Sequence, residues 1–126
     1  MRLFVFFLSS VLGCGCGVAQ QQLSMVVGTY TDRGSEGVYA YHFNQETGES
    51  ELSGSLQLVN PSYLTVSDNK RFVYAVSETN DGQASLNIIG LNRNGNMRLL
   101  ETIPTQGADP CYVATNGHLA DRKSVV

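Results

Sequence analysis

Few side chains in this sequence combine a reactive type with a suggestive position. Glu78 ends an apolar segment that begins at Phe72, and a carboxylate at a strand end can contact a ligand or cap a turn. Tyr30 and Tyr112 could line the same pocket, although tyrosines in strands more often pack against their neighbours. We therefore take Glu78, Tyr30 and Tyr112 as candidate substrate-binding residues, and the catalytic residues stay unknown.

The histidines and cysteines form no recognisable metal or nucleophile motif. His42 and His118 are the two histidines and lie far apart in the sequence. Cys14 and Cys16 make a Cys-x-Cys pair close to the N-terminus with no further ligands nearby. Cys111 is the third cysteine, and we expect it to pack as a small hydrophobic residue. We expect no metal and no cofactor.

Residues 1–19 have the composition of a secretory signal peptide. Arg2 provides a positive charge, and Leu3–Leu12 form an apolar stretch that is too short to span a bilayer. The small residues that end at Ala19 suit a signal peptidase, which would leave Gln20 first. The tetrapeptide V-L-G-C that ends at Cys14 instead resembles a bacterial lipobox. Both routes predict an exported protein in the periplasm or cell envelope; a buried first strand is the alternative.

The charge balance argues against several partners. The chain has a formal net charge of -3, and only 15% of its residues are charged, below the usual quarter. Residues 20–120 hold ten acidic and five basic residues. We expect no nucleic-acid partner and a membrane partner only if Cys14 carries lipid.

A sequence repeat of about 49 residues organises the chain. Asn60–Thr65 (N-P-S-Y-L-T) has its counterpart in Asp109–Ala114 (D-P-C-Y-V-A), 49 residues later. Val38–Phe43 matches Leu86–Leu91 at an offset of 48 residues, and a glycine turn follows both segments. A fixed period of this length is typical of proteins that stack one structural unit after another.

Within each repeat the apolar pattern has the two-residue period of strands. We expect strands at Val38–Phe43, 51–59, Ser62–Ser67 and Arg71–Ser77, with turns at Asn44–Gly48 and Ser67–Lys70. Four short strands in 40 to 50 residues are typical of a β-propeller blade. A single β-sandwich is the alternative, but it gives no reason to reuse Pro-x-Tyr at a fixed interval.

Several motifs resemble the seven-bladed lactonase family, which includes 6-phosphogluconolactonases. They occur in the family's order over residues 25–119: Val27–Thr31 with Gly37–Tyr39, Asn60–Leu64, Phe72–Glu78 and Gly107–Tyr112. The resemblance implies an all-β fold, a β-propeller with about the first two blades of an expected seven. Blade one would cover about residues 25–82 and blade two about residues 83–120.

The resemblance also implies a function, with one departure. It implies a lactonase that hydrolyses a sugar lactone such as 6-phosphogluconolactone, with water attacking the ring carbonyl while a base takes its proton; with the leader, the expectation is an exported lactonase. Many members carry histidine where this chain has Tyr112, so no role of that histidine transfers, and the other family candidates fall in later blades. The alternatives are a non-enzymatic propeller that binds carbohydrate or protein and a piece without function of its own.

The last six residues, Asp121–Val126, differ from the sequence before them. Their sequence, D-R-K-S-V-V, is what a sequencing adapter gives when translated as GAT CGG AAG AGC GTC GTG. We therefore expect a non-native tail at 121–126 that replaces the true sequence after Ala120. A genuine short C-terminal tail is the alternative.

Overall fold

The chain is a series of strands, and along them buried side chains alternate with less buried ones. The computed structural model describes residues 4–9, 22–116 and 120–124, and these form ten strands with no helix among them. In the segment after Gly37, Val38 and Ala40 are buried while Tyr39 and Tyr41 on the other face are half-buried. Within the described ranges nothing helical has the length and apolar character needed to span a bilayer.

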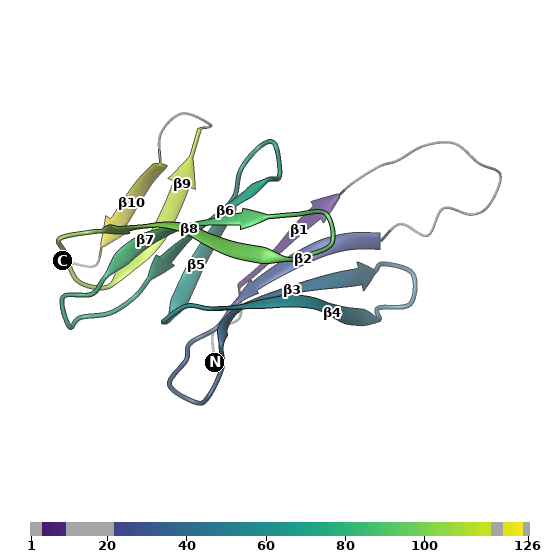
Figure 1. Ribbon diagram of the computed structural model, residues 1–126, viewed down its shortest axis with the longest axis horizontal. Coiled ribbons are helices and arrows are strands. Elements are labelled where there is room, and N and C mark those ends of the chain that lie inside the picture. Colours follow the sequence, from purple (N-terminus) through teal and green to yellow (C-terminus); the bar gives the residue numbers. More distant parts are fainter. Residues whose placement is uncertain (1–3, 10–21, 117–119, 125–126) are drawn as a thin grey trace.

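The strands form two four-stranded antiparallel sheets and one two-stranded sheet (Figure 1). The first sheet contains, in spatial order, β1 (Phe4–Ser9), β2 (Gln22–Gly28), β3 (Gly37–Asn44) and β4 (Ser50–Gln57). The second contains β5 (Pro61–Val66), β6 (Phe72–Ser77), β7 (Ser85–Leu91) and β8 (Met97–Pro104). The last pair is β9 (Pro110–Thr115) and β10 (Ala120–Ser124). In each sheet, strands that follow one another in the chain are hydrogen-bonded neighbours.

The larger buried cluster lies between the first two sheets. Val26 of β2 and Val38 of β3 meet Leu64, Val73 and Ile89 of the second sheet, and none of the five is more than 2% exposed. Burying a side chain of this size contributes roughly 1.5–3 kcal/mol. The face between the first two sheets is therefore the main source of stability.

A smaller cluster joins the second sheet to β9. Val76 and Leu86 pack against Val113, and the half-buried Tyr63 and Tyr74 cover them. The three sheets therefore stack face to face in chain order, as blades do around a propeller axis. This confirms the expected all-β partial propeller.

Glycines allow the first two sheets to approach closely. A Cβ at Gly28 would lie 2.3 Å from the carbonyl oxygen of Pro61, and a Cβ at Gly54 would lie 2.6 Å from that of Gly95. Real Cβ atoms do not come this near to backbone oxygens. The two sheets can therefore pack at this distance only without side chains at these positions.

The expected strands and turns are present, but the strands group differently into sheets. The turn at Asn44–Gly48 is confirmed, with Gly48 at a φ of 76° and the Asn44 side chain accepting the Glu46 N–H at 2.9 Å. The expected boundary between residues 82 and 83 separates β6 from β7, yet these two strands pair with each other. The sheet changes instead between β4 and β5, because a repeat sets the period of the strands and not which strand begins a sheet.

Two segments that were expected to lie outside the propeller domain take part in strand pairing. Residues 4–9 of the expected signal peptide form β1, which pairs with β2 from Phe4 opposite Gly28 to Ser9 opposite Leu23. Residues 121–124 of the expected non-native tail belong to β10. Ala19, Gln20 and the cysteines of the leader lie outside the described residues, and both the signal peptide and the tail stay predictions.

Candidate functional site

The candidate site lies at the end of the sheets where β2 and β6 both finish. Tyr30 follows the end of β2 and Glu78 follows the end of β6, so the two residues leave equivalent strands in neighbouring sheets. The Tyr30 hydroxyl donates to Oε2 of Glu78 at 2.7 Å, and both residues are half-buried. Hydrogen bonds to a charged acceptor are short and strong. This bond fixes the Glu78 carboxylate where the first two sheets meet.

Asn60 holds the two strand ends together from the connection between β4 and β5. Its backbone oxygen accepts the Glu78 N–H at 3.0 Å, and its Nδ2 donates to the Glu78 backbone oxygen at 3.3 Å. Its Oδ1 accepts both the backbone N–H and the hydroxyl of Thr31, each at 3.0 Å. One amide side chain therefore positions the backbone beside both Tyr30 and Glu78.

The same backbone feature recurs one repeat later. Asn60 has a φ of 42° and Asp109 a φ of 46°, and a proline follows each. Asn and Asp adopt this left-handed region more readily than other residues with a side chain. The Asp109 N–H donates to the Thr79 backbone oxygen at 3.0 Å. The sequence analysis missed Asn60 as a site residue, although the repeated Asn-Pro and Asp-Pro pairs mark these connections.

Tyr112, the third candidate, has a different neighbour. It lies on β9, is 39% exposed, and its ring centroid is 4.9 Å from that of Tyr63 with the rings tilted by 47°. Such tilted pairs are favourable contacts between aromatic rings. Tyr63 and Tyr112 hold the same place in successive repeats, so Tyr112 contributes to packing between β5 and β9.

Residues next to Tyr30 and Glu78 line two hollows at this end of the sheets. One hollow of about 490 Å³ includes Thr31, Ser35 and Glu36 in its lining. The other, of about 360 Å³, is lined in part by Ser77, Thr79, Asp81 and Asn87. Both have the size of small-ligand sites. Both linings combine hydroxyl, amide and carboxylate groups with the apolar Leu58 and Val59, which border both hollows.

Asp81, at this end of the sheets, has a lowered pKa. The backbone N–H of Gln83 donates to its Oδ1 at 3.0 Å and lowers the pKa of the carboxyl from its ordinary value. The side chain is exposed. Asp81 is therefore ionised near neutral pH and can accept hydrogen bonds at this end of the sheets.

Among the residues that the structure describes, the other reactive side chains form no second centre. His42 is half-buried in β3, opposite Glu51 of β4 in the strand register, and His118 lies outside the described residues. Cys111 is exposed, contrary to the expectation that it packs inside. It lies where the β9–β10 register shifts, between Tyr112 opposite Lys123 and Pro110 opposite Ser124, and such an irregularity changes the direction of a strand side chain. Over the described residues no three His, Cys, Asp or Glu side chains gather as metal ligands.

Comparison with known proteins agrees with this architecture. Residues 24–120 match the family described as lactonase, 7-bladed β-propeller, and the chain belongs to this family. It is 33% identical over 92 residues to a 6-phosphogluconolactonase of Bacillus subtilis (strain 168), and 28% identical over 94 residues to one of Formosa agariphila. Both alignments cover 71% of this chain and 26% of the relative.

Solved structures give the same result. A proposed 6-phosphogluconolactonase from Bacteroides uniformis ATCC 8492 superposes with a TM-score of 0.79 and 51% identity. A second, from Bacteroides fragilis NCTC 9343, has the same TM-score and 42% identity. Each superposition covers 82% of this chain and 30% of the solved one. The chain thus spans between a quarter and a third of the length of the proteins it matches.

Proposed function

We propose that this chain is the N-terminal part of an exported lactonase that hydrolyses a sugar lactone such as 6-phosphogluconolactone. The observation that carries the proposal is the family match over residues 24–120, together with 51% identity to a proposed 6-phosphogluconolactonase. The length of those relatives supports further blades beyond the two four-stranded sheets and the β9–β10 pair. Those blades would supply the rest of the site.

The contribution of this part of the protein is to bind the sugar. Tyr30 fixes one oxygen of Glu78 at 2.7 Å, which orients the carboxylate toward a substrate hydroxyl at the rim. Asn60 keeps both strand ends in register through its contacts with Thr31 and Glu78. A substrate held in this way presents its ring carbonyl to water, while a base and an oxyanion donor come from blades across the ring.

The test is the gene's complete reading frame, expressed and assayed with 6-phosphogluconolactone against the spontaneous rate of hydrolysis. Glu78→Gln keeps the shape but removes the charge, and losing a hydrogen bond from a charged group costs roughly 1.5–3 kcal/mol. We expect kcat/KM to fall roughly 10- to 100-fold. Glu101→Gln, on the exposed β8, is the matched control and should leave kcat/KM unchanged.

Two outcomes would contradict this proposal. A complete protein that does not accelerate lactone hydrolysis would refute the lactonase function. An active protein in which Glu78→Gln and Glu101→Gln have the same kcat/KM as the parent would keep the lactonase function but remove Glu78 from substrate binding.

A further inference from the structure

We infer that a cleft between the first two sheets, at the opposite end of the strands from Tyr30 and Glu78, binds the phosphoryl group of a small phosphate or phosphate ester. β6 begins at Phe72, directly after Lys70 and Arg71, and ends at Ser77, directly before Glu78. Its six residues span roughly 20 Å. The cleft is therefore separate from the candidate sugar site.

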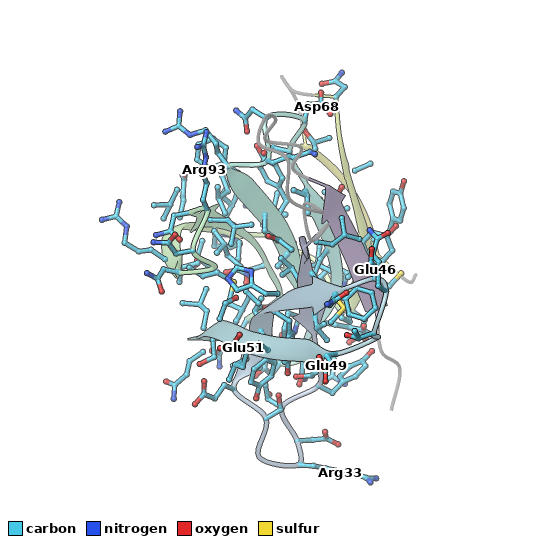
Figure 2. The ribbon with its side chains drawn as sticks, turned by 90° about the vertical axis from the view of Figure 1, so that its right-hand side faces the viewer. Arg33, Glu46, Glu49, Glu51, Asp68 and Arg93 are labelled. Atoms are coloured by element: carbon cyan, nitrogen blue, oxygen red, sulfur yellow. The ribbon has the colours of Figure 1, made fainter. Side chains whose placement is uncertain are left out.

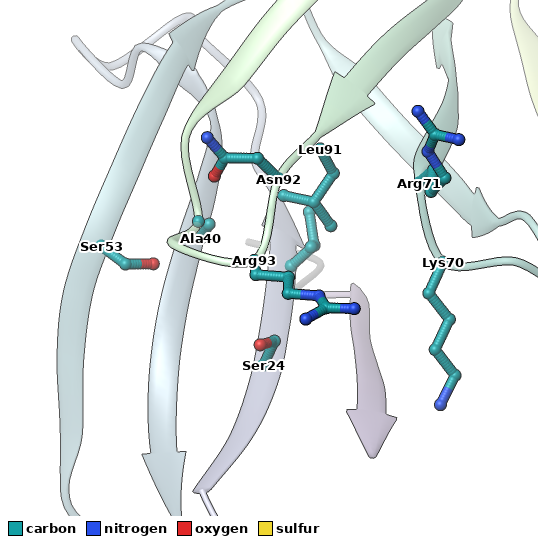
Figure 3. Close-up of a pocket in the computed structure, with 10 residues that line it drawn as sticks. Ser24, Ala40, Ser53, Lys70, Arg71, Leu91, Asn92 and Arg93 are labelled. Carbon is teal, nitrogen blue, oxygen red and sulfur yellow. The ribbon is translucent and has the colours of Figure 1, made fainter. Parts of the chain in front are cut away.

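The cleft is formed by both sheets and has a volume of about 360 Å³. The first sheet contributes Ser24 from β2 and Ser53 from β4 to the lining, and the second contributes Lys70, Arg71 and Arg93 from two turns. In Figure 3 the Arg93 side chain lies between Ser24 of the first sheet and the turn that carries Lys70 and Arg71. The described lining residues lie between positions 24 and 95.

The charge around this cleft is the reverse of that of the rest of the chain. Residues 20–120 contain twice as many acidic as basic residues, yet no Asp or Glu belongs to the described lining of the cleft. An adjoining hollow shares Arg71 with the cleft, adds Arg98, and has no carboxylate among its described lining residues either. Four of the five basic residues of this range, all but Arg33, therefore surround two connected hollows.

The cations of this cleft come from two turns of the second sheet, and Asp68, in the same turn as Lys70, is not among the described lining residues. Arginine guanidinium groups bind phosphate through paired N–H donors. Ser53 also lines the cleft, and its buried Oγ makes no hydrogen bond within the described structure.

The distribution of arginines offers a matched control. Figure 2 shows Arg93 and Arg33 at opposite ends of the molecule. Arg33 lies in the connection between β2 and β3, at the end of the sheets that carries Tyr30, and it is exposed, as is Arg93. Arg33→Gln and Arg93→Gln change the net charge equally, but only Arg93→Gln removes a cation from the cleft.

The experiment uses the whole 126-residue chain, captured on a sensor surface at low density so that neighbouring chains do not associate. Inorganic phosphate, glucose 6-phosphate and glucose are passed over the surface, and binding is recorded by surface plasmon resonance. We expect both phosphates to bind and glucose not to bind. Arg93→Gln should weaken phosphate binding roughly fivefold, equivalent to about 1 kcal/mol, and Arg33→Gln should leave it unchanged.

The comparison of ligands and variants decides the inference. Tighter binding of glucose 6-phosphate than of inorganic phosphate identifies an ester as the ligand, and equal binding identifies the free ion; both support the site. If Arg93→Gln fails to fold by circular dichroism, Arg71→Gln, which also removes a cation from the cleft lining, takes its place and should also weaken binding. No phosphate signal, equal binding of glucose, or equal losses in Arg33→Gln and the cleft variant would overturn the inference.

Discussion

Replacing Gly28 by alanine should separate the first two sheets, whereas the same change at Gly90 should not. A Cβ at Gly28 would lie 2.3 Å from the Pro61 carbonyl oxygen, and carbon–oxygen contacts normally begin at roughly 3.3 Å. Because the obstacle is backbone, the sheets must part locally by about 1 Å. A gap of that size removes roughly a quarter to a half of the attraction between each pair of atoms.

The expected cost of Gly28→Ala follows from these contacts. Overpacked cores lose about 1–3 kcal/mol, and alanine regains roughly 0.4–1 kcal/mol by restricting the unfolded chain, which leaves a net loss of about 1–2 kcal/mol. At Gly90 the new Cβ would meet only the Leu100 side chain, with Cδ1 at 3.3 Å. Leu100 is 43% exposed and can move aside, so Gly90→Ala should change stability by less than about 0.5 kcal/mol.

Pulse proteolysis across a urea series measures this difference in dilute solution, where association of the chain is suppressed. With a urea slope of about 1–3 kcal/mol per molar, Gly28→Ala should lower the midpoint by roughly 0.5–1 M. Gly90→Ala should keep the midpoint of the parent chain. Equal midpoints for the two variants would refute the conclusion that Gly28 sets the distance between the first two sheets.

Three further predictions follow from the rim, the leader and the exposed strands. Asp81 has a lowered pKa, so its hydrogen bond from Gln83 stabilises the β6–β7 connection above the unfolded pKa and is lost as the pH falls through the folded pKa. An NMR titration of the Gln83 amide should show this transition at a lower pH than an unstructured Asp peptide in the same buffer, and a transition at or above the pH of the peptide would contradict it. Expression in an exporting host should yield an intact mass that begins at Gln20; a lipid-modified Cys14 would replace simple cleavage, and a mature protein that begins at Met1 would rule out removal of the leader. The purified segment Gln20–Val126 should not accelerate hydrolysis of 6-phosphogluconolactone and should elute from gel filtration as an assembly, because β8 exposes Leu99, Leu100 and Ile103 by 39–43%; a monodisperse, active monomer would contradict both statements.

Local features of the fold could be predicted from the sequence because they depend on near neighbours. The Asn44–Gly48 turn needs only a glycine that accepts a positive φ and an asparagine that bonds to the following backbone. The grouping of β5–β8 into one sheet depends instead on pairing between distant segments, and the repeat is equally compatible with other starting points. The sequence therefore predicted the strands and their period, but not where each sheet begins.

The candidate site shows the same limit. Tyr30 and Glu78 were expected to share a pocket. The hydrogen bond between them joins residues 48 positions apart, so it can be recognised only when the stacking of the first two sheets is known. Asn60 could have been noticed in the sequence, because a proline follows both it and its counterpart one repeat later. Its role in the site became clear only from its positive φ in the structure. Arg93 and Lys70 lie on separate turns, and only the packing of the second sheet on the first brings them to one cleft.

The most direct test of the central claim is the genomic nucleotide sequence after the codon for Ala120. If the chain is the first part of a propeller lactonase, the reading frame will replace Asp121–Val126 with an apolar strand and continue through further repeats of about 49 residues. Those repeats should extend the protein to the length of its relatives, of which this chain now spans 26%. A stop codon within a few residues of Ala120, or a continuing frame without the repeat, would contradict the account.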